Sequence, residues 1–180
     1  MPEFARDLSV ETGIGVARIT GSVSAHDLTD EQISFKAFEF EPNLPEGYDV
    51  RKCSAILLVV EGLIALDEVK MDLSIETKAL ASPCSGQGLD ALEWGENGCS
   101  VTVGTEDEEC LSHRFPGLKL KNKLAIEYGE QSMKLRLSNL GRCRSPSFHF
   151  ILAENDDPET VEASSWYAVD QPHSLLLEQQ

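Results

Sequence analysis

The chain has 180 residues, of which 41% are hydrophobic and 26% are charged, and its formal net charge is -16. This composition is typical of a folded domain, and the length suits one domain with a substantial core. The negative charge disfavours nucleic acids and anionic membranes as partners, because the field of the whole molecule repels polyanions. We expect a single domain whose partner is another protein.

The N-terminus and the cysteines favour a cytoplasmic protein. The first residues, MPEFARDLSVE, lack the basic region and apolar run of a secretory signal. The most apolar segment, 54–66, is too short to span a bilayer. The five cysteines are odd in number and contain no C-x-x-C spacing, so we expect reduced thiols and no zinc site.

The pattern of the first half of the chain predicts strands separated by turns. Segment 10–24 predicts one or two strands interrupted by glycine. Segment 33–40 predicts a strand whose alternation changes parity between Ala37 and Phe38, which suggests a bulge. Segment 54–61 has no alternation and predicts a strand buried on both faces, whereas 69–78 alternates throughout.

A hairpin is predicted around the turn at 95–98. Asn97-Gly98 supplies the positive φ that such a turn needs. With this turn, we expect Leu92 and Trp94 to face Val101 and Cys99.

A second hairpin is predicted over 118–138, where apolar residues alternate on both sides of a turn at 129–132. The expected core-side pairs are Tyr128 with Met133, Ile126 with Leu135 and Leu124 with Leu137.

This hairpin lies in a basic region of an acidic protein. Between Arg114 and Arg144 there are eight Lys or Arg residues and two carboxylates. One interpretation is a solvated face whose lysines discourage sheet-to-sheet aggregation. The other is a partner-binding face on the hairpin, made of Lys119, Lys121, Lys123, Lys134 and Arg136.

The remaining segments complete an all-β fold. Segment 147–153 predicts a further strand, and a short helix is expected to begin with Asp157 as N-cap and Pro158 as its first residue. We predict one antiparallel β-sandwich or jelly-roll-like barrel of roughly eight to ten strands with little helix. It would span 1–153, with 154–180 as an acidic C-terminal segment packed on the same domain.

No catalytic, metal-binding or cofactor-binding residue is predicted. The four histidines share no metal-ligand spacing. His149 alternates with Phe148 and Phe150, so it is expected at the surface if those rings fill the core. Ser112-His113 is interpreted as adjacent strand residues that cannot form a dyad, and the acidic clusters at 105–110 and 154–159 as solvated loops.

The resulting hypothesis is a non-enzymatic protein-binding module, an acidic cytoplasmic interaction protein of the inhibitor or immunity type. Its interface would be the basic hairpin face or the acidic termini. An alternative is a carbohydrate-active or metal-assisted jelly-roll enzyme, which a pocket joining His113, His149 and carboxylates would favour. A third is a structural subunit of a larger assembly.

Overall fold

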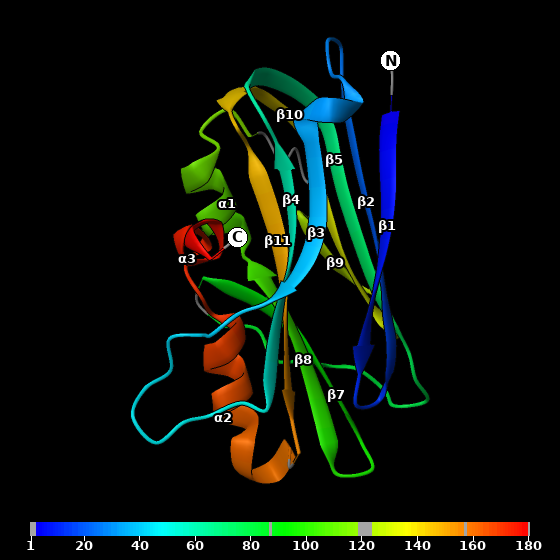
Figure 1. The fold of residues 1–180 in the computed structure, drawn as a ribbon, viewed down its shortest axis with the longest axis vertical. Coiled ribbons are helices and arrows are strands. Elements are labelled where there is room, and N and C mark those ends of the chain that lie inside the picture. The colour runs from blue at the N-terminus through cyan, green and yellow to red at the C-terminus, as the bar shows by residue number, and fades with distance from the viewer. Residues whose placement is uncertain (1–2, 87, 119–123, 157, 180) are drawn as a thin grey trace.

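The protein is a β-sandwich, as the alternating patterns predicted. The computed structural model describes residues 3–86, 88–118, 124–156 and 158–179. Two antiparallel sheets of five and six strands pack face to face and do not close into a barrel (Figure 1). No helix in these ranges is long and apolar enough to cross a bilayer.

The five-stranded sheet has the order β1-β2-β5-β10-β9. Its strands are β1 (Glu3–Thr12), β2 (Gly15–Ala25), β5 (Leu63–Glu76), β10 (Ser132–Arg144) and β9 (Ile126–Tyr128). Along β5, buried residues alternate with partly exposed ones, because one face of this sheet meets the core and the other meets water. The strand predicted over 69–78 is thereby confirmed, but it begins earlier, at Leu63, and ends two residues earlier, at Glu76.

The six-stranded sheet has the order β3-β4-β11-β8-β7-β6. Its strands are β3 (Ile33–Glu39), β4 (Lys52–Val60), β11 (Ser147–Asn155), β8 (Cys99–Glu106), β7 (Leu89–Glu96) and β6 (Ser82–Pro83). All nine residues of β11 are buried, and β4 is buried along almost all of its length. The absence of alternation in 54–61 therefore has the predicted cause, which is burial on both faces, and β11 is buried in the same way.

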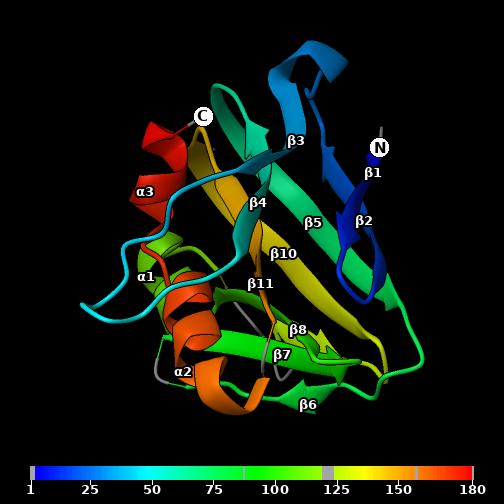
Figure 2. The same cartoon turned by 60° about the horizontal axis from the view of Figure 1, so that its bottom comes forward.

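The six-stranded sheet is covered on both faces. Its inner face meets the other sheet around Trp94, Phe148 and Phe150. Its outer face carries α2 (Pro158–Val169) and α3 (His173–Glu178), whereas α1 (Glu108–Arg114) follows the end of β8 and packs Leu111 into the core between the sheets (Figures 1 and 2). A second apolar cluster lies beneath α2 and α3, and it includes Phe40, Ala55, Ile151, Ala153, Val169 and Leu176.

The second apolar cluster explains why the predicted bulge in β3 is wrong. The pairing of β3 with β4 runs without a shift from Ile33 to Glu39. Phe35 packs into the core between the sheets, whereas Phe38 packs into the cluster under the helices. Because both faces of the sheet are apolar, a change of parity needs no bulge.

The hairpin of β7 and β8 is confirmed, but its predicted register is wrong by two residues. Leu92 lies opposite Val103 and Trp94 lies opposite Val101. The turn consists of Asn97 and Gly98 alone, at φ values of 54° and 75°. Positive φ at both positions is typical of a type I′ turn, which allows the strands to pair up to the turn itself.

The hairpin of β9 and β10 is confirmed over a shorter length than predicted. Tyr128 lies opposite Met133, and Ile126 lies opposite Leu135. The predicted core side is correct for Ile126 and wrong for Tyr128, which is 40% exposed. The predicted pair of Leu124 and Leu137 does not form as a strand pair, because β9 begins at Ile126 and Leu124 is 66% exposed.

Two acidic clusters are more ordered than the solvated loops that we expected. Residues 105–110 contain the end of β8 and the first turn of α1, so Ser112 and His113 lie on a helix and not on a strand. Residues 154–159 begin with the buried end of β11, and α2 begins at Pro158 as predicted. The predicted N-cap, Asp157, lies outside the described residues.

Candidate functional site

An acidic pocket lies where the edge strand β9 meets the loop before β7 and the first turn of α1. Its volume is about 590 Å³. We call this cavity the acidic pocket. It is lined by Ser85, Gly86, Leu89, Asp90, Asp107, Glu108, Glu109, Leu124, Ile126 and Tyr128.

Hydrogen bonds between distant segments hold one wall of the acidic pocket. The Tyr128 hydroxyl on β9 donates to the Asp90 carboxylate on β7. The same hydroxyl lies 2.6 Å from the Ser85 hydroxyl. These contacts join the edge of one sheet to the loop of the other, so the wall is preformed.

The opposite wall is the start of α1. The Asp107 side chain caps this helix by accepting from the backbone N–H of Cys110 at 2.9 Å, and it also accepts from Gly88 N–H at 2.9 Å. Glu108 accepts from Ala125 N–H at 2.7 Å. Carboxylates are favourable in the first turn of a helix, where the backbone N–H groups carry partial positive charge.

The electrostatic character of the acidic pocket is negative. Four of its lining residues are carboxylates, and the described lining contains no Lys, Arg or His. Partial burial raises the pKa of Asp90, and the neighbouring charges of Asp107 and Glu108 raise it further, although the Tyr128 hydrogen bond acts the other way. A site that disfavours its own negative charge favours an incoming cation.

Apolar surface lies beside these carboxylates. Leu124 is 66% exposed and Tyr128 is 40% exposed, and both belong to the lining. Together they give the mouth of the acidic pocket an apolar contact area next to its charge.

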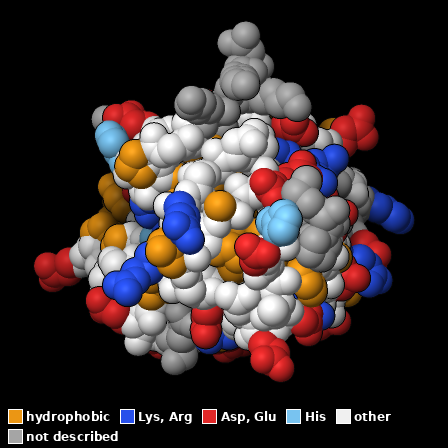
Figure 3. Space-filling model, turned by 90° about the horizontal axis from the view of Figure 1, so that it is seen from above, with side chains coloured by type: hydrophobic (Ala, Val, Ile, Leu, Met, Phe, Trp, Pro, Cys, Tyr) orange, Lys and Arg blue, Asp and Glu red, His pale blue; other side chains and the backbone are white. Residues whose placement is uncertain are grey.

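The predicted basic face is only partly described. Lys119, Lys121 and Lys123 lie outside the described residues. On β10, Arg136 forms an ion pair with Asp72 of β5 at 2.5 Å, and Lys134 lies opposite Asp72 on one side and Glu127 on the other. Both described cations of this face thus have carboxylates beside them on the neighbouring strands, although Arg136 lies directly opposite Lys70 of β5. At the end of the sandwich seen in Figure 3, basic and acidic side chains are likewise interspersed.

A second groove, of about 540 Å³, lies beside the loop between β3 and β4. This loop runs past α2 and α3 (Figure 2). The Gln171 side chain exchanges two hydrogen bonds with the backbone of Asn43, and Gln179 does the same with Glu41. The groove is lined by both signs of charge, including Glu39, Glu41, Asp49, Arg51 and Lys52.

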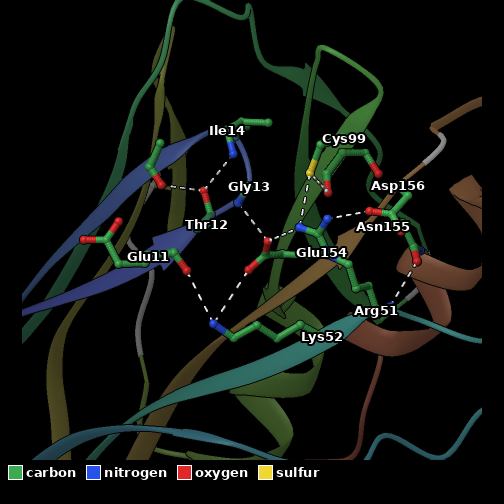
Figure 4. Close-up of polar contacts among 12 residues, drawn as sticks. Glu11, Thr12, Gly13, Ile14, Arg51, Lys52, Cys99, Glu154, Asn155 and Asp156 are labelled. Atoms are coloured by element: carbon green, nitrogen blue, oxygen red, sulfur yellow. Dashed lines mark hydrogen bonds and ion pairs between the residues drawn. The ribbon is translucent and has the colours of Figure 1, made fainter.

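The cationic side chains of this groove, Arg51 and Lys52, form ion pairs with carboxylates of the same chain (Figure 4). The Arg51 guanidinium donates to Glu154 at 2.9 Å and also to Asp156, and its contact with Glu154 is the main reason why the pKa of Arg51 is raised. The buried Glu154 carboxylate also accepts from Gly13 N–H at 2.8 Å. This network joins the β1–β2 turn to the ends of β4 and β11, so its role is to close one end of the sandwich.

A buried polar cluster lies on the outer face of the six-stranded sheet, beneath α3. The Nδ1 atoms of His149 on β11 and His173 on α3 are 2.7 Å apart. The Glu106 carboxylate lies 4.0 Å from His149 Nδ1 and 2.8 Å from the Arg114 guanidinium. We call Glu106, His149 and His173 the histidine cluster.

The position of His149 corrects the sequence interpretation. Phe148 and Phe150 do fill the core, so His149 points to the outer face as expected. It is nevertheless only 2% exposed, because α3 covers that face. His113, which the enzyme hypothesis had joined to His149, is exposed on α1, and His173 takes its place.

Both imidazoles of the histidine cluster are held in the neutral form. Burial lowers the pKa of His149 well below its usual range, and the neighbouring His173 and Arg114 act in the same direction. Burial, followed by the charge of Arg114, lowers the pKa of His173 to about 3. At neutral pH the two rings therefore present nitrogen lone pairs and N–H donors without net charge.

Burial keeps the thiols of Cys53, Cys99 and Cys110 from being activated. None of the five, all of which lie in the described part of the chain, forms a disulfide. Burial raises the pKa of Cys53 and Cys99, and it raises that of Cys110 to about 11. Thiols with raised pKa values are poor nucleophiles at neutral pH.

Comparisons with known proteins do not add to these sites: no family model, curated protein or solved structure matches the chain. The fold therefore defines the class, an open β-sandwich with helices on one outer face, and the functional argument depends on the sites themselves.

Proposed function

We propose that the protein is a binding module that takes a basic segment of a partner protein into the acidic pocket. The observation that carries this proposal is the lining: four carboxylates, without a cation among the described lining residues, beside exposed Leu124 and Tyr128. A Lys or Arg side chain suits such a surface, because its charged head can reach the carboxylates while its stem covers apolar area.

The size and order of the acidic pocket favour a peptide segment over a free ion. A volume of about 590 Å³ in an open, surface-facing hollow has room for several side chains of a segment that lies across it. Asp90, Asp107 and Glu108 each accept a hydrogen bond from the protein, which fixes their positions and leaves their charge to attract a cation. The net charge of -16 would speed the approach of a basic partner.

The basic hairpin face remains the second candidate interface. Lys119, Lys121 and Lys123 directly precede Leu124 in the sequence. A binding experiment must therefore separate an acidic site that takes basic peptides from a basic face that takes acidic ones. A cytoplasmic location fits five cysteines without a disulfide and belongs to the same proposal.

The test is a peptide-binding titration by fluorescence anisotropy. The probes are a labelled peptide of alternating Lys and Leu and its counterpart of alternating Glu and Leu. The variant Asp90→Asn with Glu109→Gln removes two charges from the acidic pocket. The control variant, Glu41→Gln with Asp49→Asn, removes the same charge from the second groove.

We expect the Lys-Leu peptide to bind and the pocket variant to weaken it about tenfold or more, since one lost charged contact is worth about 1.4 kcal/mol. The control variant should retain most of the affinity. Equal losses in the two variants would show attraction to the overall charge and overturn the acidic pocket as the site. Binding of the Glu-Leu peptide, abolished by changing Lys119, Lys121 and Lys123 to Gln, would assign the interface to the basic face.

A further inference from the structure

The histidine cluster contains the ligand types of a transition-metal site. The donor atoms of Glu106, His149 and His173 lie within 4.8 Å of one another. They come from the end of β8, the third residue of β11 and the first residue of α3. Three segments far apart in the chain thus bring two imidazole nitrogens and one carboxylate oxygen together.

We propose that the histidine cluster binds one divalent transition-metal ion of the zinc class, through His149 Nδ1, His173 Nδ1 and a Glu106 carboxylate oxygen. Two imidazoles and one carboxylate form a ligand set that suits Zn²⁺ and similar dications, whereas Ca²⁺ and Mg²⁺ prefer oxygen ligands alone. A set of three protein ligands leaves a further coordination position for a small ligand.

Hydrogen bonds around the histidine cluster orient the ring nitrogens of His149 and His173. The Ser147 hydroxyl lies 2.6 Å from His173 Nε2. When Nε2–H donates to Ser147, the Nδ1 lone pair of His173 points at His149, which is the arrangement of a metal-ligating histidine held by an outer partner. In the metal-free cluster, His149 Nδ1–H then donates to His173 Nδ1. When a metal binds, this proton leaves Nδ1 of His149 and Nε2 of the same ring takes up a proton, so that His149 stays a neutral ligand.

Binding requires a small movement of α3. Two ligands of a tetrahedral zinc ion stand roughly 3.4 Å apart, given bonds of about 2.0–2.1 Å. The two Nδ1 atoms are 2.7 Å apart, so they must separate by about 0.7 Å. This adjustment is within reach of His173, because α3 has only six residues and follows an exposed Pro172.

Arg114 affects how tightly the histidine cluster can bind a divalent metal ion. Its guanidinium pairs with Glu106 and donates to the backbone oxygen of Ser147, so it orients the carboxylate but also repels a dication. Its side chain is 25% exposed, which lets solvent screen part of this repulsion. We therefore expect a moderate affinity rather than that of a closed structural zinc site.

The test is metal titration of the chelator-treated protein. Co²⁺ binding is followed by visible absorption, and Zn²⁺ binding by calorimetry and thermal melting. We expect one equivalent of each ion to bind and Zn²⁺ to raise the melting temperature. His173→Gln should weaken both effects at least tenfold, whereas the control His113→Gln, on the exposed face of α1, should leave them unchanged.

A second variant keeps the test decisive if His173→Gln fails to fold. Ser147→Ala preserves all three ligands but removes the outer hydrogen bond, and should weaken Co²⁺ and Zn²⁺ binding about tenfold. Absence of saturable binding in the unmodified protein would overturn the proposal. Equal binding by the unmodified protein and either cluster variant, with circular dichroism showing a folded chain, would overturn it as well.

Discussion

The acidic pocket and the histidine cluster are separated by a single peptide bond of the chain. Glu106 belongs to the histidine cluster, where its side chain is 13% exposed and pairs with Arg114. Asp107 belongs to the acidic pocket, where it caps α1. The change occurs because β8 ends at Glu106 and the helix begins directly afterwards.

The carboxylates that follow one another from Glu106 to Glu109 are therefore stabilised in two different ways. Burial raises the pKa of Glu106 and the nearby Arg114 opposes that rise, so this carboxylate depends on its partner. The carboxylates of the acidic pocket depend instead on backbone N–H groups and a hydroxyl, and their charge remains available to solvent or a ligand. A change on one side should therefore affect mainly stability, and a change on the other mainly binding.

The largest effect is expected from Arg114→Met. This change leaves Glu106 without its cation in a mostly buried site and should lower the free energy of unfolding by about 3 kcal/mol. Glu109→Gln, on the acidic-pocket side of the same helix, should change it by less than about 0.5 kcal/mol. Urea denaturation measures both changes in the free energy of unfolding. Similar values for the two variants would show that the Glu106–Arg114 pair contributes no more to stability than a carboxylate of the acidic pocket.

A second change tests the packing of α2 on the outer face of the six-stranded sheet. Gly104 of β8 lies under α2, and a Cβ atom at this position would stand 2.8 Å from the Cβ of Val169. Gly104→Ala should therefore cost about 1–3 kcal/mol through overpacking.

The matched variant for Gly104→Ala is the double substitution with Val169→Ala. Removing the Val169 methyl groups takes away the second close contact, with Cγ2 at 2.8 Å, and leaves the Cβ contact, so the two costs should be less than additive in thermal or urea unfolding. Additive costs would show that the overlap between Gly104 and α2 is not the source of the loss.

A third prediction concerns the pH dependence of peptide binding to the acidic pocket. The pKa of Asp90 is raised, chiefly by burial, so this carboxylate loses its charge at a higher pH than an ordinary aspartate, whose pKa is about 4. Affinity for the Lys-Leu peptide should therefore fall on acidification, beginning above that value. In Asp90→Asn this component should be missing from titrations repeated across the acidic range.

Asp90 has the opposite effect on the pH dependence of folding stability. Because folding raises the pKa of Asp90, its contribution favours the folded state at low pH and is lost as the pH rises through the raised value. Asp90→Asn should therefore not destabilise the protein at neutral pH. A large loss there would mean that the Tyr128 contact requires the charged carboxylate.

The sequence was sufficient to predict the sandwich because alternation survives wherever one face of a sheet is wet, as in β5 and the β9–β10 hairpin. It also contained a sign of the second apolar face, namely the lack of alternation in β4 and β11 and the change of parity at Phe38. The parity change is interpreted from the sequence as a bulge, and His149, which alternates with two core phenylalanines, is expected at the surface because nothing local shows that α3 covers that face.

The sites could not be predicted in the same way. The helices α1 and α3 have seven and six residues, which is too short for a clear helical period. The partners that define each site are distant in sequence: Tyr128 meets Asp90 across 38 residues, and His149 meets His173 across 24. Such contacts depend on how the two sheets and the helices pack, which local patterns do not determine.

The smallest change in peptide affinity and in folding stability is expected from Leu124→Ser. This variant tests directly whether the partner segment covers the apolar surface beside the acidic pocket. Leu124 is 66% exposed, so replacing it should change the free energy of unfolding by less than about 0.5 kcal/mol. If the partner segment covers this side chain, the lost apolar contact should still weaken the Lys-Leu peptide by about fivefold, or about 1 kcal/mol. Leu80→Ser is the matched control, because Leu80 is 78% exposed and is not part of the acidic pocket. Unchanged affinity in Leu124→Ser would restrict recognition to charge alone, and an equal loss in the control would place the apolar contact outside the acidic pocket.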